Sequence, residues 1–147
     1  MARKDHVAVY KPNSRKQGSA LQLKLGSERS CMFLELAPQA EGPNPFDWTN
    51  RKIIVKLGPS DIGKLLVLFN RVFPPTTDET KPDLQLFHKN PKGNKIIKIK
   101  HQENGYYMKV SASEGGKNNA IAIPITWDEV ELIKIALNRG YEIMLGW

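Results

Sequence analysis

The chain has 147 residues, which is enough for one domain with a sizeable hydrophobic core. Its 40% hydrophobic and 25% charged residues are typical of a globular protein. The formal net charge of +7 favours a polyanionic partner, either nucleic acid or an anionic membrane surface, although basic charge also aids solubility. The single cysteine, Cys31, excludes an intramolecular disulfide.

The start of the chain, MARKDHVAVYKPN, lacks the apolar segment of a secretory signal. No apolar run approaches the length of a membrane span. One cysteine fits a reducing compartment. We therefore expect a soluble cytoplasmic protein without a membrane partner, associated with a nucleoid or, if the source is viral, present in the host cytoplasm.

In the first half, apolar residues alternate with polar ones in four segments. This alternation predicts strands at Val7–Lys11, Ala20–Leu25, Met32–Leu36 and Arg51–Leu57. Residues 38–50 are rich in Pro, Gly and Asn and predict a long loop, which Phe46 and Trp48 would hold in place. Apolar residues at helical spacing predict a helix over Ser60–Phe73, opened by Gly58-Pro59 and ended by Pro74-Pro75.

The second half follows the same plan. We expect strands at Leu84–Lys89, Lys95–His101, Tyr106–Ser111 and Ala120–Ile125, with a hairpin turn at Asn104-Gly105 and a loop over Glu114–Asn119. Pro124 cannot donate a backbone hydrogen bond, so the last strand should lie at a sheet edge. The capping-box pattern Thr126–Glu129 opens a final helix, Gly140 is the expected stop, and the apolar residues 141–147 should pack on the domain or on another subunit.

The two halves are similar in sequence as well as in plan. The Ala120–Tyr141 segment matches the segment that starts at Ile53 when the chain is shifted by 68 positions. Leu84–Lys89 matches the first strand at a shift of 77 positions. The second and third strands match their counterparts at 74, which makes Lys24 equivalent to Lys98. Chance matches between amphipathic strands would not preserve the order of five elements. We therefore expect a single domain, 1–147, made of two ββββα repeats at about 7–73 and 84–141 with a linker at 74–83.

These repeats predict an α+β fold in which each antiparallel sheet is covered on one face by one helix. The other face of each sheet is then open, and alternation assigns its residues. Aromatic residues point outward at equivalent positions of the two halves, Tyr10 with Phe87 and Phe33 with Tyr107. Lysines are interleaved with them on the same faces.

Rings and lysines on one open face suit single-stranded nucleic acid, because bases stack on rings and lysines neutralise phosphates. The stacking candidates are Tyr10, Phe33, Phe87 and Tyr107, and the phosphate candidates are Lys24, Lys56, Lys98, Lys100, Lys109 and Lys117. Two alternative roles stay open for these residues. Outward rings also stabilise neighbouring strands or are covered by a subunit, and strand lysines also protect sheet edges. A scaffold protein that joins subunits through its open sheets is therefore the alternative function.

Catalytic motifs are absent from the sequence. The three histidines, His6, His88 and His101, have no ligand spacing with cysteines, and Gly115-Gly-Lys117 lacks the glycine spacing of a P-loop. Cys31 has no activating neighbour in the sequence. We expect no enzyme, no metal site and no cofactor.

Two segments carry a family resemblance. NNAIAIPITWDEVELIKIAL resembles the strand-to-helix element of the positive-cofactor-type transcriptional coactivators, and RKIIVKLGPSDIGKLLVLF is similar to it. Two ββββα units in one chain resemble the Whirly family, although the lysine-glycine-lysine motif of plant members is matched only loosely by Lys95–Lys100. The resemblance implies a pseudo-two-fold fold that binds single-stranded DNA through strand-borne aromatic and basic residues. It also implies RNA-binding relatives and homo-oligomers, dimers or larger, that pack through the helices and tail.

Overall fold

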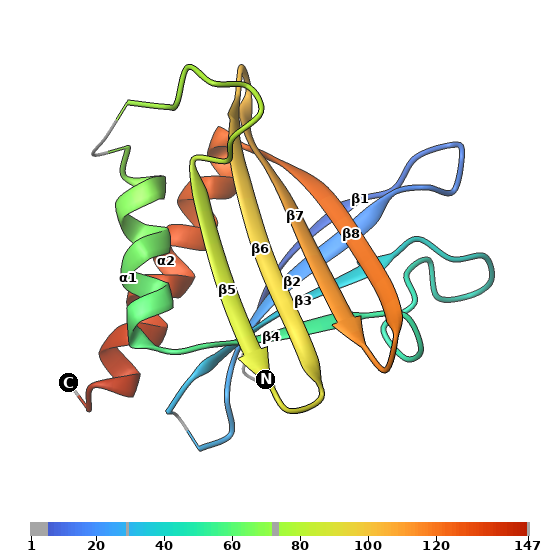
Figure 1. Ribbon diagram of the computed structural model, residues 1–147, viewed down its shortest axis with the longest axis horizontal. Coiled ribbons are helices and arrows are strands. Elements are labelled where there is room, and N and C mark those ends of the chain that lie inside the picture. Colours follow the sequence, from blue (N-terminus) through green and yellow to red (C-terminus); the bar gives the residue numbers. More distant parts are fainter. Residues whose placement is uncertain (1–5, 29, 72–73, 147) are drawn as a thin grey trace.

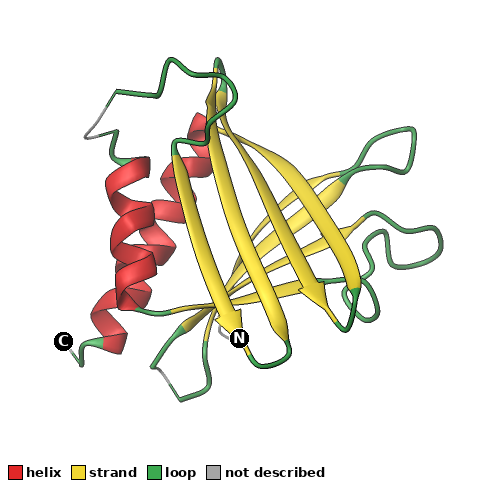
Figure 2. Cartoon of the chain, viewed as in Figure 1, coloured by secondary structure: helices red, strands yellow, loops and turns green. Residues whose placement is uncertain are grey.

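The computed structural model describes residues 6–28, 30–71 and 74–146 (Figure 1). Sheet 1 contains β1 (His6–Lys11), β2 (Ser19–Leu25), β3 (Met32–Pro38) and β4 (Ile53–Leu57), and it is followed by α1 (Pro59–Phe69). Sheet 2 contains β5 (Leu84–Asn90), β6 (Gly93–Gln102), β7 (Gly105–Glu114) and β8 (Lys117–Thr126), and it is followed by α2 (Trp127–Met144). Each sheet is antiparallel with its strands in chain order. Figure 2 shows the strands of both sheets together with the two helices. The predicted ββββα repeat is confirmed.

The two sheets and both helices share one hydrophobic core. The sheets cross with their inner faces toward each other, and the helices lie side by side along one edge (Figure 1). The core includes the inward leucines of β2 and β3, the inward isoleucines of β6 and β8, and the buried faces of α1 and α2. The sheets also contact each other directly, since Ser19 Oγ donates a hydrogen bond of 2.6 Å to the Ala122 carbonyl.

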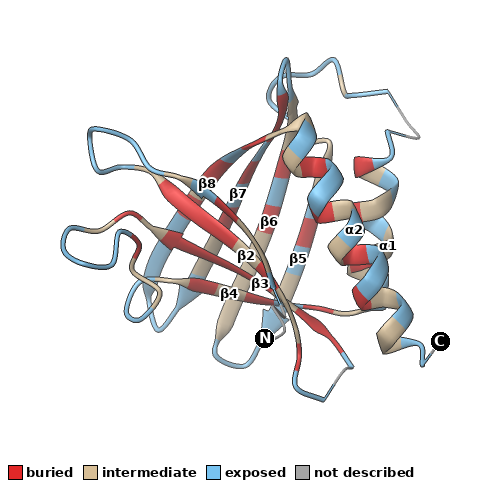
Figure 3. Ribbon diagram, turned by 180° about the vertical axis from the view of Figure 1, so that it is seen from behind, coloured by how far each residue is buried: buried red, intermediate tan, exposed pale blue. Residues whose placement is uncertain are grey.

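Alternation along the strands predicted the inner face correctly. Buried and accessible residues alternate on the strands in Figure 3, because successive side chains of a strand point to opposite faces. The inward residues of β4, for example, are Ile53, Val55 and Leu57, and all three are buried.

Short sequence motifs correctly predicted where both helices begin and that β8 lies at a sheet edge. The Thr126 amide donates to Glu129 Oε1 at 2.9 Å, so the predicted capping box opens α2. The Gly58 amide donates to Asp61 Oδ2 at 3.0 Å at the start of α1. β8 is the last strand of sheet 2, so Pro124 lies at an edge as expected.

Several predicted boundaries were wrong, and three of them have a clear local reason. α1 ends at Phe69 and not at Phe73, because Arg71 takes a left-handed conformation with φ of 55°; residues 72 and 73 lie outside the described part. β8 begins at Lys117, so the predicted loop over Glu114–Asn119 is mostly strand. Gly115 and Gly116 have φ of 57° and 78°, and two consecutive positive values allow a two-residue hairpin turn.

Gly140 is the third case. It does not stop α2, which continues to Met144. A Cβ at this position would collide with Met32 Sδ on β3, so the glycine lets the helix approach sheet 1 closely. Within the described residues, neither helix is both long and apolar enough to cross a membrane.

Candidate nucleic-acid interface

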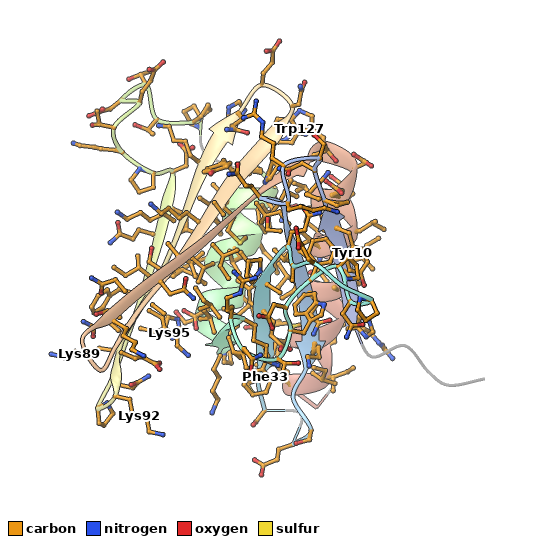
Figure 4. The ribbon with its side chains drawn as sticks, turned by 90° about the vertical axis from the view of Figure 1, so that its right-hand side faces the viewer. Tyr10, Phe33, Lys89, Lys92, Lys95 and Trp127 are labelled. Atoms are coloured by element: carbon orange, nitrogen blue, oxygen red, sulfur yellow. The ribbon has the colours of Figure 1, made fainter. Side chains whose placement is uncertain are left out.

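The outer face of sheet 1 carries a basic and aromatic row. In the strand register, Phe33 of β3 lies between Lys24 of β2 and Lys56 of β4. Lys56 is exposed, whereas Lys24 and Phe33 are half-buried. Three predicted binding residues therefore lie side by side on one face (Figure 4 labels Phe33).

A buried carboxylate lies beside this row. Glu35 is 1% exposed although it points to the outer face. Its Oε2 lies 2.7 Å from Lys24 Nζ, its Oε1 lies 2.9 Å from Lys52 Nζ, and Gln22 Nε2 donates to it at 3.2 Å. Burial raises the pKa of the Glu35 carboxyl, but the hydrogen bonds from Lys24, Lys52 and Gln22 lower this pKa by more, so it lies below its usual value. Lys24 is thus partly neutralised within the chain.

An aromatic cluster covers the other end of this face. The loop between β3 and β4 folds back over the sheet, and Phe46 packs on the small side chains of Ala20 and Ala37 with Trp48 beside them. Tyr10 stacks on Phe46 with ring centroids 5.7 Å apart and remains 55% exposed. Tyr10 therefore offers a ring surface supported from within the protein (Figure 4).

The outer face of sheet 2 is more basic. Lys98 of β6 and Lys109 of β7 are directly opposite each other and both are exposed. Within the described residues, neither ammonium group has an acidic partner within ion-pair distance. Like charges at opposite positions of a sheet repel. A phosphate between them would remove this repulsion.

Two exposed rings flank the lysine pair. Phe87 of β5 is 54% exposed and Tyr107 of β7 is 40% exposed. Tyr107 lies one outward position along β7 from Lys109, and Phe87 lies in register with Ile96, one outward position from Lys98. The two free lysines thus lie between two exposed rings on this face.

Lys100 and Lys117 have different surroundings. Lys100 Nζ donates to the carbonyls of Asp78 and Lys81 at 2.8 and 2.6 Å, so it fastens the linker to sheet 2. Lys117 is exposed at the hairpin between β7 and β8, opposite Glu114. Of the predicted phosphate ligands, Lys24 and Lys100 already have partners in the chain.

The register also corrects one equivalence between the halves. Lys24 lies opposite Phe33, and Lys100 lies opposite Tyr107, so Lys24 corresponds to Lys100 and not to Lys98. The sequence match was off by two residues. A shift of two keeps every side chain on its face, so the assignment of outward residues was unaffected.

Lysines at the β5–β6 hairpin extend the basic surface. Lys89 and Lys92 are exposed, and Figure 4 shows them at the end of the molecule on the side of sheet 2. Lys95 instead donates to the Ile54 carbonyl at 2.6 Å and lies 3.8 Å from Glu114, so it ties sheet 2 to β4. Lys89 and Lys92 lengthen a basic track that begins at Lys98 and Lys109.

A family model described as Whirly transcription factor matches residues 6–136. The chain belongs to the Whirly family. Comparison of the sequence with curated proteins gives no match. Whirly proteins are nucleic-acid-binding transcription factors.

Solved structures share this Whirly fold. The plant transcriptional regulator PBF-2 is 22% identical with a TM-score of 0.71, over 97% of this chain and 82% of that one. WHY3 from Arabidopsis thaliana is 19% identical with a TM-score of 0.71, over 100% of this chain and 92% of that one. A guide-RNA-binding protein complex bound to a gRNA is 11% identical with a TM-score of 0.69, over 97% and 92%. At these identities the likeness concerns the fold alone.

In this Whirly protein, His101 and Cys31 are packed within the fold. His101 packs against Tyr106 and Trp127 with ring centroids 5.9 and 5.4 Å apart, and Cys31 is buried. Among the residues described, no three His, Cys, Asp or Glu side chains come close enough to hold a metal ion. Gly115 and Gly116 form a hairpin turn and not a phosphate-binding loop.

Sequence reasoning missed two features of the interface. Glu35 received no role, although an acidic residue at an outward position with outward lysines nearby was a signal for an ion-pair network. Phe46 was expected to hold its loop, and the sequence did not show that it would support Tyr10. The Glu35–Lys24 ion pair and the Phe46–Tyr10 stack each join residues on different segments of the chain.

Proposed function

We propose that this Whirly protein binds single-stranded nucleic acid along the outer faces of its two sheets, DNA in preference to RNA and with little sequence specificity. Exposed rings would stack on bases, and unpaired lysines would neutralise phosphates. The observation that carries the proposal is the Lys98–Lys109 pair, two exposed ammonium groups in direct opposition beside Phe87 and Tyr107. Such repulsion is expected where an anion is bound.

The test is a titration of labelled oligo-dT, a matched duplex and a matched RNA, each at two salt concentrations. We expect oligo-dT to bind more tightly than the duplex. The affinity should fall as salt rises, with a logarithmic slope of about −0.7 for each phosphate neutralised. No binding to any of the three would reject the function. Equal binding to duplex would indicate a merely basic protein, and tighter binding to RNA would reverse the preference.

We also propose that the protein self-associates through α2. Leu132 and Ile135 are 52% and 67% exposed, and their spacing of three residues places them on one side of the helix. Exposed apolar side chains in a shared patch are typical of protein–protein contacts. This contact would leave both outer sheet faces open, whereas the alternative scaffold function would cover them.

Light scattering of the wild type and of Leu132→Glu/Ile135→Glu separates these possibilities. We expect an oligomer for the wild type and a smaller species for the double variant, with oligo-dT binding per chain retained at high protein concentration. A monomeric wild type would contradict self-association. An oligomer that persists in the double variant but is lost in a sheet-face variant would favour the scaffold function.

A further inference from the structure

The outer face of sheet 2 contains a hollow of about 340 Å³ near the hairpin ends of β6, β7 and β8. We call it the sheet 2 cup, and its outward-facing residues are Asn94, Ile96, Ser111, Ser113, Asn118 and Ala120. Figure 1 shows these strand ends on the side of sheet 2 away from the helices. None of the six residues was among the predicted binding residues.

Small side chains produce the hollow. Ile96, Ser111 and Ala120 lie in one row across β6, β7 and β8. The long side chains of Lys98 and Lys109 stand in the neighbouring row on one side. The short side chains of Ser111 and Ala120 therefore leave a hollow beside the longer side chains of Lys98 and Lys109.

The rim of the cup is polar. Asn94, Ser113 and Asn118 form the adjacent row on the hairpin side. Within the described residues, their side-chain amide and hydroxyl groups donate no hydrogen bond to another protein group, whereas the nearby Asn90 side chain accepts from two backbone amides. An amide offers both donors and an acceptor, so this rim can pair with a flat ligand that has polar edges.

The surroundings of the cup supply the other groups that a nucleotide needs. Phe87 lies in register with Ile96 at the wall and is 54% exposed. Lys109 precedes Ser111 by one outward position, and Lys89 lies in register with Asn94. A flat ligand in the cup therefore has a ring beside it and ammonium groups on two sides.

We propose that the sheet 2 cup receives one unstacked nucleobase of a bound single strand. The base lies against Ile96 and Ala120, its polar edge faces the Asn94 and Asn118 amides, and its phosphates lie toward Lys89 and Lys109. This inference rests on the proposed single-strand binding and deepens it. It adds to the stacking rings of sheet 2 a site that holds a single base.

The test compares two oligomers of the same length, oligo-dT and an abasic oligomer that keeps the sugar-phosphate chain but has no bases. Ser111→Ile fills the cup with a β-branched side chain suited to a strand. We expect this variant to bind oligo-dT about tenfold more weakly than the wild type, the size of one stacked base. Its affinity for the abasic oligomer should stay within twofold of the wild type, because the lysines are unchanged.

Thr77→Ile is the control, since it adds the same side chain at an exposed position of the linker, outside both outer sheet faces. It should leave both affinities unchanged. If Ser111→Ile fails to fold, Ala120→Leu fills the cup from the exposed edge strand and has the same expected result. Asn118→Ala leaves the cup open and should change the ratio of oligo-dT to oligo-dA affinity at least twofold.

The outcomes separate the cup from the function on which it rests. If the wild type binds oligo-dT and Ser111→Ile binds it equally well, the cup holds no base. Equal losses for oligo-dT and the abasic oligomer would also overturn the proposal, because the cup would then act on the backbone. Failure of the wild type to bind any oligomer would instead reject single-strand binding itself.

Discussion

The ammonium group of Lys24 lies 2.7 Å from Glu35 Oε2 on the outer face of sheet 1, where Glu35 is 1% exposed. Lys52 holds the other carboxylate oxygen at 2.9 Å. The centre of this face therefore carries a fixed negative charge shared between two lysines. The Lys98–Lys109 pair of sheet 2 has no such partner among the described residues, so the two faces differ in the charge that they offer to phosphate.

Replacing Glu35 with glutamine should release Lys24 and Lys52 for phosphate. We expect tighter binding of oligo-dT and a salt slope steeper by up to about 1.4, which corresponds to two further phosphate contacts on a single strand. The loss of a buried charged acceptor should lower the free energy of unfolding by about 1–3 kcal/mol. Salt titrations and urea unfolding measure the two effects. Glu79→Gln, an exposed carboxylate of the linker, is the control for net charge.

The same carboxylate gives a pH dependence. Hydrogen bonds lower the pKa of Glu35 in the folded state despite its burial, and its pKa in the unfolded chain is about 4.3. The unfolded state therefore binds the proton first as pH falls. The stabilisation from Glu35 is fully present above this value and is lost as pH falls through the folded pKa.

Urea unfolding of the wild type and of Glu35→Gln tests whether the stabilisation from Glu35 is lost as pH falls. Their difference in free energy of unfolding should be largest near pH 7 and should shrink below about pH 4. A difference that is the same at pH 7 and pH 3 would show that ionisation of Glu35 does not stabilise the fold.

The opposed lysines of sheet 2 should show opposite effects on binding and stability. Lys98→Ala removes a like-charge repulsion and should raise the free energy of unfolding by about 0.2–1 kcal/mol. It should also weaken oligo-dT binding and reduce the salt slope by about 0.7. Thermal unfolding and salt titrations measure both. Lys64→Ala, at an exposed position of α1, should leave binding unchanged. Weaker folding in Lys98→Ala would contradict the unpaired state of this lysine.

The outward rings should contribute to binding and little to folding. Phe33→Ala and Tyr107→Ala should each weaken oligo-dT binding by about 1–3 kcal/mol, the worth of one stacked base. Fluorescence anisotropy gives the affinity, and circular dichroism checks that the fold is retained. If these variants bind normally but change the oligomeric state, the two rings belong to a subunit interface.

Two glycines of the helices should respond to alanine in opposite directions. Gly140→Ala places a methyl group against Met32 and should cost about 1–3 kcal/mol through overpacking. Gly63→Ala in α1 meets open space and should stabilise the helix by about 1 kcal/mol. Thermal unfolding measures both changes. Equal effects would mean that helix propensity, and not contact with sheet 1, governs position 140.

Much of the fold could be predicted because its signals are local. The alternation in β4 and β8 has a period of two, which fixes the inner face even when the register is uncertain. This is why the outward lysines and rings were assigned correctly although Lys24 was matched with Lys98. The capping box at Thr126 uses residues three apart, so it too is visible in the chain.

The ββββα repeat, the inner and outer faces of the strands and the basic, aromatic character of the outer faces follow from the amino-acid sequence alone. These properties depend on neighbours within a few residues. Four contacts became visible only in the folded chain: Glu35 neutralises Lys24, Phe46 supports Tyr10, Lys100 holds the linker, and Gly140 makes room for Met32. Each of these contacts depends on strand register, loop path or helix packing, which bring together side chains that are distant in the chain.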